Sequence, residues 1–177
     1  DWSSDVCSSD LDTHFDTNKI NSAAIAAQRV FLTDKNHLLM ESLRSFFNEI
    51  HIREFFNVTD AASKQKISLR VIDYFVTNYC RDKSVSYTHP RGNNAFIVHD
   101  SYKSQLKAYS KKQFDPFCRR MRINFYYKPE KSVETTVGQL NFFRWAIENG
   151  VIVYIRNNLK QIEEHMRQYN YKANDAT

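Results

Sequence analysis

The residues most suited to chemistry in this chain lie between Lys103 and Arg122. This stretch, KSQLKAYSKKQFDPFCRRMR, holds seven Lys or Arg side chains and one acid, Asp115. From Ser101 to Lys128 there are eight basic residues against that one acid, a local net charge of +7. Because the whole chain carries +5, the other 149 residues sum to −2, and the positive charge is regional. Such a concentration attracts phosphate groups, so this stretch is a candidate nucleic-acid site.

Residues 100–113 separate charged and apolar side chains at the spacing of a helix. At about 100° per residue the apolar positions fall within about 60° of one another, and the lysines lie well round the cylinder. We expect Asp100 or Ser101 to cap this helix and Asp115-Pro116 to end it, because the residue before a proline is pushed out of the α region. The apolar stripe consists of Tyr102, Leu106 and Tyr109, and the cationic stripe consists of Lys103, Lys107 and Lys111.

Residues 120–127 alternate in the manner of a half-buried strand. One face carries Met121, Ile123, Phe125 and Tyr127, and the other carries Arg120, Arg122, Asn124 and Tyr126. Residues two apart on a strand project about 6 to 7 Å from one another, so the arginines would continue the positive row of the preceding helix. The candidate nucleic-acid-binding residues are therefore Lys103, Lys107, Lys111, Lys112, Arg119, Arg120, Arg122 and Tyr126.

Aromatic residues are interleaved with these charges, and this bears on the kind of ligand. Exposed rings stack on unpaired bases, a contact worth about 1 to 3 kcal/mol per base, and lysines add an attraction that depends on salt but not on base sequence. Two other interpretations stay open: the basic run is a solvated face, or it is a surface for a protein partner. The rings in question are Tyr109, Phe114, Phe117 and Tyr126.

The segment FDPFC, residues 114–118, predicts a turn anchored in the core by Phe114 and Phe117. Asp115 would then cap the turn or pair with Arg119 or Arg120. The alternative makes Asp115 a metal-binding or catalytic carboxylate. A nuclease site would need a second acid and a lysine nearby, and the acid and lysine at positions 130 and 131 have the wrong spacing. We therefore do not assign Asp115 a catalytic role.

The elements before this region are predicted from the same periodicities. Amphipathic spacing predicts helices over residues 34–50 and 69–80, with a short helical piece and a loop between them. Thr33 or Asp34 is placed to cap the first of these helices, and Ser68 the second. Residues 22–31 favour a further short helix. Two β-favouring pieces, residues 85–87 and 95–99, flank Pro90 and Gly92 and predict a looped strand pair.

The last third of the chain predicts a hairpin of two helices. Thr136 and Gln139 have the spacing of a capping box, Gly150 supplies a left-handed turn, and a second helix follows over residues 151–169. A helix-turn-helix is the alternative, although Asn149 and Arg156 occupy positions that are normally apolar in that motif. The aromatic residues of the first helix predict either a buried element or an oligomer interface; they are Phe142, Phe143 and Trp145.

Composition limits the fold class. The 177-residue chain is 42% hydrophobic and 14% aromatic with only three Gly and three Pro, which excludes disordered, collagen-like and linker-rich chains. No run reaches the roughly 18 apolar residues of a membrane-spanning helix, so we expect no membrane association. The element order gives an α+β domain dominated by helices, with a small sheet and the C-terminal helical hairpin. We expect one globular domain over residues 12–170 and a polar tail over 171–177.

The sequence indicates neither a cofactor nor a metal. The three cysteines, Cys7, Cys80 and Cys118, are far apart, and the six histidines form no i,i+4 pair. Glycine occurs only at positions 92, 138 and 150, which excludes a Gly-rich phosphate loop. We name no catalytic residue, and we favour a protein that is not an enzyme while leaving the question of activity open.

Two resemblances concern origin. Residues 1–11, DWSSDVCSSDL, resemble the translated sequencing adapter found at the ends of reading frames assembled from environmental DNA, so we expect them not to be native protein and the true N-terminus to be truncated. Three stretches, ISLRVIDYFVTNYC, YKSQLKAYSKKQFDPFCRR and TTVGQLNFFRWAIENGVIVYI, resemble an uncharacterised family of proteins from giant viruses, the nucleocytoplasmic large DNA viruses. That resemblance implies a viral protein in the host cytoplasm or virus factory, or in the virion. It implies no activity.

Together these observations predict a non-enzymatic viral protein that binds nucleic acid through the basic helix and strand. The alternative is a virion structural or assembly protein that docks a protein partner, or a second copy of itself, through the aromatic-rich C-terminal helices.

Overall fold

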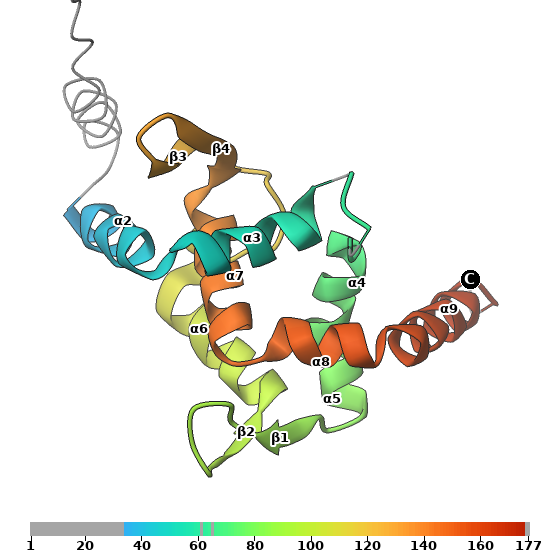
Figure 1. Cartoon of the computed structure of the whole chain (residues 1–177). Coiled ribbons are helices and arrows are strands. Elements are labelled where there is room, and N and C mark those ends of the chain that lie inside the picture. Colours follow the sequence, from blue (N-terminus) through green and yellow to red (C-terminus); the bar gives the residue numbers. More distant parts are fainter. Residues whose placement is uncertain (1–33, 61, 65, 176–177) are drawn as a thin grey trace, which may run out of the picture.

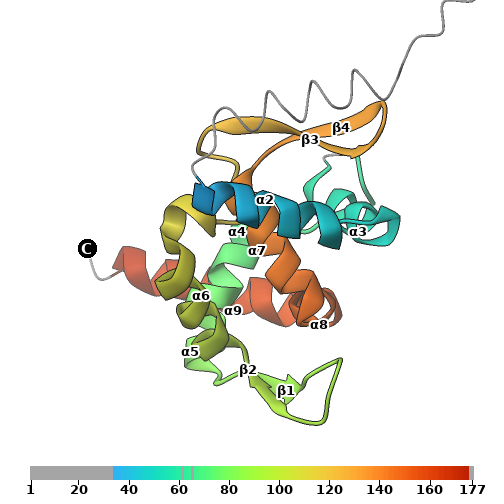
Figure 2. The ribbon, with the colours of Figure 1, turned by 90° about the vertical axis from the view of Figure 1, so that its left-hand side faces the viewer.

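Helix α7 (Val137–Glu148) packs against four other helices and one strand of the fold. The computed structural model describes residues 34–60, 62–64 and 66–175 (Figure 1). In both ribbon views α7 runs through the middle of the molecule, with the other helices around it (Figures 1 and 2). The predicted buried role of its aromatic residues is confirmed, because Phe142 and Phe143 are fully buried and Trp145 is 4% exposed.

Helices α2 (Asp34–Phe46) and α3 (Glu49–Thr59) form two elements where the sequence predicts one helix through Ile50. The break lies at Asn48, whose side-chain oxygen accepts hydrogen bonds from the backbone N–H groups of Ile50 and His51, each at 3.0 Å. That cap starts a new helix and turns Ile50 outward, so this residue is 72% exposed. The predicted short helical piece is therefore a helix of three turns.

The next helical rod consists of α4 (Leu69–Tyr74), a π-helical turn η1 (Phe75–Tyr79) and α5 (Cys80–Asp82). Its predicted N-cap is confirmed, since the Ser68 side chain accepts a hydrogen bond from the backbone N–H of Arg70. The rod buries one face, which includes Ile72, Phe75 and Val76. It is followed by the predicted strand pair, β1 (Ser86–Thr88) and β2 (Ala95–Ile97).

Helix α6 (Val98–Gln113) starts directly after β2. The predicted caps, Asp100 and Ser101, are wrong: the N-cap is Ile97, and both polar residues lie inside the first turns of the helix. Ser101 has a different role, because its hydroxyl oxygen accepts a hydrogen bond from the Trp145 indole at 2.9 Å. This bond fixes α6 against α7.

The predicted strand over residues 120–127 is β3 (Arg122–Lys128), paired antiparallel with β4 (Lys131–Thr136). Phe125 of β3 is buried against Phe47, with the ring centroids 5.8 Å apart. Met121 lies before the strand and is exposed, so its predicted place on the buried face is wrong. Strand β4 was not predicted.

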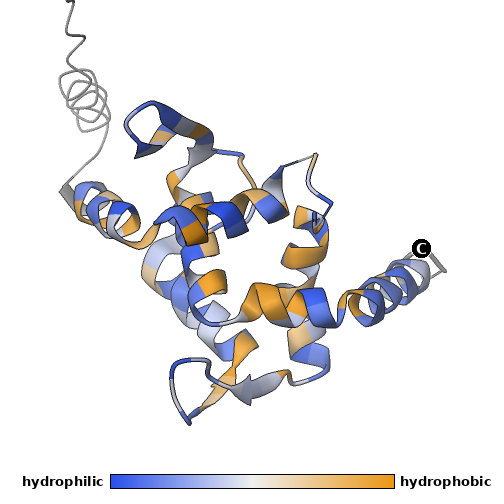
Figure 3. Ribbon diagram, in the orientation of Figure 1, coloured by the Kyte–Doolittle hydropathy of each residue, from blue (hydrophilic) through white to orange (hydrophobic). Residues whose placement is uncertain are grey.

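The predicted residues at both ends of α7 are confirmed. The Thr136 hydroxyl accepts a hydrogen bond from the backbone N–H of Gln139 at 3.1 Å, and Gly150 has a left-handed φ of 74°. The second helix is divided at Asn158 into α8 (Val151–Asn157) and α9 (Leu159–Asp175). Figures 1 and 3 show α9 extending from the body, with mostly hydrophilic residues on it, whereas α7 and α8 carry many hydrophobic ones.

These elements make an α+β fold dominated by helices, as predicted, with two small antiparallel sheets. Within the described ranges, no helix has the length and apolar character that crossing a membrane requires. The expectations for residues 1–11, for a helix over residues 22–31 and for a cap at Thr33 fall outside the described residues.

Candidate nucleic-acid interface

The eight predicted site residues are distributed over one helix, one connection and one strand. All seven cations are exposed, and Tyr126 is half-buried. Helix α6 carries Lys103, Lys107, Lys111 and Lys112, the connection after it carries Arg119 and Arg120, and β3 carries Arg122 and Tyr126.

Lys103 and Lys107 form the regular part of the predicted cationic stripe. They lie one helical turn apart, a rise of about 6 Å, on the side of α6 away from the buried Tyr102. Neither has a carboxylate partner among the described residues. Both charges are therefore available to an anionic ligand.

The stripe does not continue straight to Lys111, and this corrects the sequence prediction. Ser110 has φ 59° and ψ 169°, so the backbone leaves the helical path one residue before the next lysine. Lys111 and Lys112 lie beyond that break and are exposed at the C-terminal end of α6. The helix dipole favours cations at such an end.

The turn after α6 confirms the structural interpretation of Asp115. This side chain is 8% exposed, accepts a hydrogen bond from the backbone N–H of Phe117 at 3.2 Å and pairs with Arg119 at 3.1 Å. The Arg119 guanidinium also lies over the Phe117 ring, 4.5 Å from its centroid. Arg119 is therefore held in place, and its charge is partly balanced.

Carboxylates from other elements balance two more cations of the basic region. Arg122 on β3 forms an ion pair with Glu134 on β4, and Lys128 pairs with Glu49 of α3 at 2.6 Å. The hydrogen bond to Glu134 raises the pKa of Arg122, and the one from Lys128 lowers the pKa of Glu49. Exposed cations without a carboxylate partner in the described part of the region are Lys103, Lys107, Lys111, Lys112 and Arg120.

A second acid, Asp73 of α4, lies within electrostatic reach of the α6 end and was missed from the sequence. Burial raises its pKa, the nearby Asp115 raises it further, and Lys111 and Arg119 act in the opposite direction. Burial, followed by these two carboxylates, also raises the pKa of Tyr102 to about 12. The only sequence signal was an acid placed between Ile72 and Tyr74 in an otherwise apolar helix segment.

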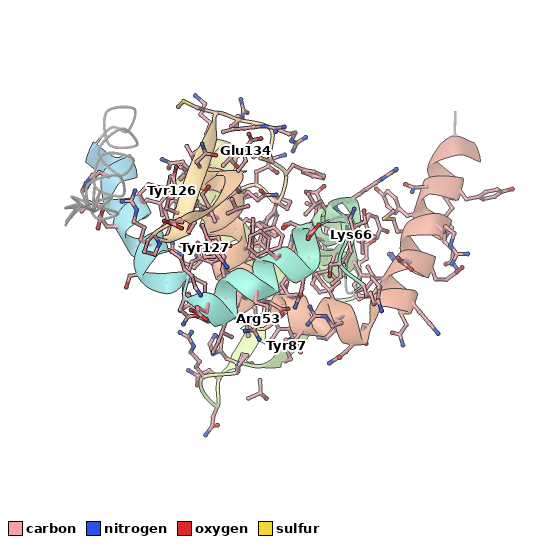
Figure 4. All side chains as sticks on the ribbon, turned by 45° about the horizontal axis from the view of Figure 1, so that its top comes forward. Arg53, Lys66, Tyr87, Tyr126, Tyr127 and Glu134 are labelled. Carbon is pink, nitrogen blue, oxygen red and sulfur yellow. The ribbon has the colours of Figure 1, made fainter. Side chains whose placement is uncertain are left out.

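Tyr126 is separated from the lysines. It follows Arg122 by four residues, about 13 Å along a strand. The next side chain, Tyr127, points to the opposite face of the strand, where its ring packs against Phe56 with the centroids 5.8 Å apart. Figure 4 shows Tyr127 on the side of the hairpin toward α3, and Glu134 is labelled on the same hairpin. Tyr126 therefore belongs to the outer face of the β3–β4 hairpin.

The described residues contain no group of three or more His, Cys, Asp or Glu side chains that could hold a metal ion. Of the cysteines, Cys80 is buried and Cys118 half-buried, both are free, and Cys7 lies outside the described residues. Burial raises the pKa of both described thiols. Neither is therefore an activated nucleophile.

Helix α8 occupies the position of a recognition helix in the helix-turn-helix alternative, but Asn149 before it and Arg156 within it form bonds inside the protein. Asn149 donates to the Trp145 carbonyl at 2.7 Å and contacts the His89 ring at 2.9 Å. Arg156 pairs with Glu54 of α3 at 2.6 Å. These contacts fit a packed corner between helices and explain why both positions are polar here.

Comparison with known proteins bears on origin. A model of a family of unknown function, DUF7197, matches residues 16–176. The chain belongs to this family. A relative, uncharacterized protein L507 of Acanthamoeba polyphaga mimivirus, is 45% identical over 109 residues, which cover 58% of this chain and 42% of the relative. The chain thus spans less than half the length of that relative, and the resemblance to an uncharacterised giant-virus family is confirmed. No solved structure matches the chain.

Proposed function

We propose that this viral protein binds nucleic acid through the exposed basic segment formed by α6 and the connection to β3. The observation that supports the proposal is the set of five exposed cations that have no carboxylate partner among the described residues. These are Lys103, Lys107, Lys111, Lys112 and Arg120. Arg119, Arg122 and Tyr126 flank them, and the two arginines contribute less because acids already balance them.

The physical basis is electrostatic. Unpaired surface cations displace condensed counterions from a phosphate backbone, and the released ions drive binding at low salt. The proposal assigns no base-reading residue and no catalytic residue, and it places the protein in the host cytoplasm or virus factory, or in the virion.

Fluorescence anisotropy with labelled single-stranded RNA, single-stranded DNA and duplex tests the proposal. At about 50 mM salt we expect saturable binding that weakens steeply as salt rises. The variant Lys107→Glu with Arg120→Glu should bind at least about tenfold more weakly, since it replaces two attractive charges with repulsive ones.

The matched control is Lys83→Glu with Lys160→Glu. It makes the same change in net charge at two exposed lysines: Lys83 lies at the end of α5, and Lys160 lies on α9. Absence of binding at about 50 mM salt, or equal weakening by the two double variants, would contradict the proposal.

The alternative, an assembly protein docking through the aromatic C-terminal helices, has less support after the fold is known. The rings of α7 that would form the docking surface are buried. Loss of self-association on Trp145→Ala would therefore also follow from loss of the core.

A further inference from the structure

A hollow of about 560 Å³ opens between α2, α6 and α7. Its volume is within the range of about 300 to 1,000 Å³ that small-molecule sites occupy. Its walls combine aromatic rings with polar side chains from three helices. They are Ser42, Ser45 and Phe46 of α2, Gln105 and Tyr109 of α6, and Arg144, Trp145 and Glu148 of α7, with Asn149 after it.

Several polar groups of the hollow lack a protein partner. In the described part of the chain, the Ser45 hydroxyl, the Gln105 amide and the Tyr109 hydroxyl take part in no hydrogen bond of the structure. Ser45 is exposed and Gln105 and Tyr109 are half-buried, so these groups are open to water and can bond a ligand that enters the hollow. They supply both donors and acceptors.

The guanidinium of Arg144 is the cationic group of the hollow. It donates to the Ser42 hydroxyl at 2.6 Å and to the Asn141 side-chain oxygen at 2.7 Å, and no carboxylate within the described ranges pairs with it. Two bonds hold the planar group in a fixed orientation. Because an arginine has five N–H donors, three remain for a ligand.

The charge around the hollow favours an anion. Glu148 lies one turn after Arg144, but Arg91 of the β1–β2 loop already pairs with it at 2.7 Å. These three side chains leave a net charge of +1. A fixed guanidinium binds phosphate oxygens with two parallel hydrogen bonds, which a lysine does not.

The rings favour a planar partner. Tyr109 is half-buried: part of its ring packs against the hydrophobic core, and it has no ring contact with another described aromatic residue. The Phe46 ring has one face covered by His51, at 4.0 Å between centroids, and Trp145 is nearly buried. The part of the Tyr109 ring that faces the hollow is thus the surface on which a flat aromatic group would stack.

We propose that this hollow binds a nucleoside monophosphate. Arg144 and Ser45 hold the phosphate, Tyr109 stacks on the base, and the Gln105 amide bonds to the base edge. The hollow lies on another side of α6 from two of the strand-binding lysines, since Lys103 and Lys107 lie about 160° round α6 from Gln105. The nucleotide is either free or one unit of a strand.

Isothermal titration calorimetry with AMP, GMP, CMP and UMP tests the proposal, with adenosine and inorganic phosphate as partial ligands. We expect at least one monophosphate to bind saturably, and each partial ligand to bind at least about tenfold more weakly. Arg144→Gln should weaken binding about ten- to a hundredfold, because it removes hydrogen bonds to a charged group. A short oligonucleotide that displaces the monophosphate assigns the site to a strand unit, and failure to displace it assigns the site to the free nucleotide.

Gln105→Leu is a second variant at a half-buried position, for which we expect about tenfold weaker binding with the circular dichroism spectrum unchanged. Lys103→Ala with Lys107→Ala should weaken strand binding and leave monophosphate binding unchanged, which separates the two proposals. The inference would be overturned if no nucleotide bound saturably up to about 10 mM, ten times the concentration needed to half-fill a site with a Kd of about 1 mM. Equal binding of adenosine or phosphate, or unchanged affinity in both folded variants, would also overturn it.

Discussion

Ser110 holds the least favourable backbone conformation among the described residues of the basic segment. Its φ of 59° with ψ of 169° lies in a region that is open to glycine and closed to side chains, at a cost of about 1 to 3 kcal/mol. The break lets α6 turn toward the connection that carries Arg119 and Arg120. The strain is therefore linked to the shape of the candidate interface.

Replacing Ser110 by glycine should stabilise the protein. Ser110→Gly removes the strain and adds a glycine entropy cost of about 0.5 to 1 kcal/mol. We expect a net gain of about 1 kcal/mol in the free energy of unfolding, a rise of roughly 2 to 4 °C in Tm for a chain of this size. Ser104→Gly, in the regular part of α6, is the matched control and should lower Tm. A lower Tm for Ser110→Gly would contradict the strain.

Asp73 predicts a pH dependence of stability. Its pKa is raised in the folded state, by burial first and Asp115 second, so the folded protein prefers the protonated acid. That contribution is complete below the pKa of the unfolded chain and is lost as pH rises through the folded pKa. Asp73→Asn should therefore raise the free energy of unfolding at pH 7, by less than about 1 kcal/mol because the group is half-exposed.

Urea unfolding at pH 7 and at about pH 3.5, below the ordinary aspartate value, measures this effect. The gain from Asp73→Asn should shrink at the lower pH, where the wild-type acid is already protonated. A gain that is equal at both pH values would show that ionisation of Asp73 is not its cause.

At the scale of elements, Gln139 joins three segments. Its side-chain oxygen accepts from the Thr135 hydroxyl at 2.7 Å, and its amide donates to the Pro116 carbonyl at 2.9 Å. This ties β4 and α7 to the turn that precedes the cations of the connection. In a capping box the same side chain would bond back to the N-cap, so the predicted spacing is right and the contact is different.

Gln139→Leu should destabilise the protein by about 2 kcal/mol or more, because it leaves the buried Thr135 hydroxyl and the Pro116 carbonyl without their partner. Gln161→Leu, at an exposed position of α9, should change stability by less than about 0.5 kcal/mol. Chemical denaturation measures both. Equal effects of the two changes would argue against the buried network.

Gly138 sets how closely the start of α7 approaches the end of α6. A Cβ there would lie 3.2 Å from the Lys112 carbonyl oxygen and 3.4 Å from the Phe114 nitrogen, whereas one at Gly92 would meet nothing within 4 Å. Gly138→Ala should therefore cost about 1 to 3 kcal/mol of stability. Gly92→Ala should stay within about 0.5 kcal/mol of wild type in the same denaturation experiment. Tolerance of alanine at both sites would contradict the close approach.

Local signals predicted the elements that depend on local physics. Ser68, Thr136 and Gly150 mark helix ends through bonds and backbone angles within a few residues. Strand β4 was missed because KSVETT has a single strongly apolar residue, Val133, and becomes a strand by pairing with β3. The break at Ser110 likewise has no local signal, since serine is not typical of that conformation.

At the scale of the whole molecule, the extent of the candidate interface depends on which of its cations are paired with carboxylates from other elements. The sequence correctly located the positive segment but not its neutralisation, because the acids that pair with Arg122 and Lys128 come from β4 and α3. Glu49 is 79 positions from Lys128, a separation at which sequence patterns carry no contact information. The basic surface is therefore smaller than the local charge of +7 suggests.

The salt dependence of binding measures that surface directly. Each phosphate contact to a single strand contributes about −0.7 to the slope of log K against log salt, so five unpaired cations predict a slope of about −3.5. Lys103→Ala with Lys107→Ala should reduce its magnitude by about 1.4, whereas the control pair Lys83→Ala with Lys160→Ala should leave it unchanged. The slope is obtained from anisotropy titrations across a range of salt. A slope near zero, or one insensitive to the first pair, would exclude an interface made of these cations, because phosphate contacts cannot form without releasing counterions.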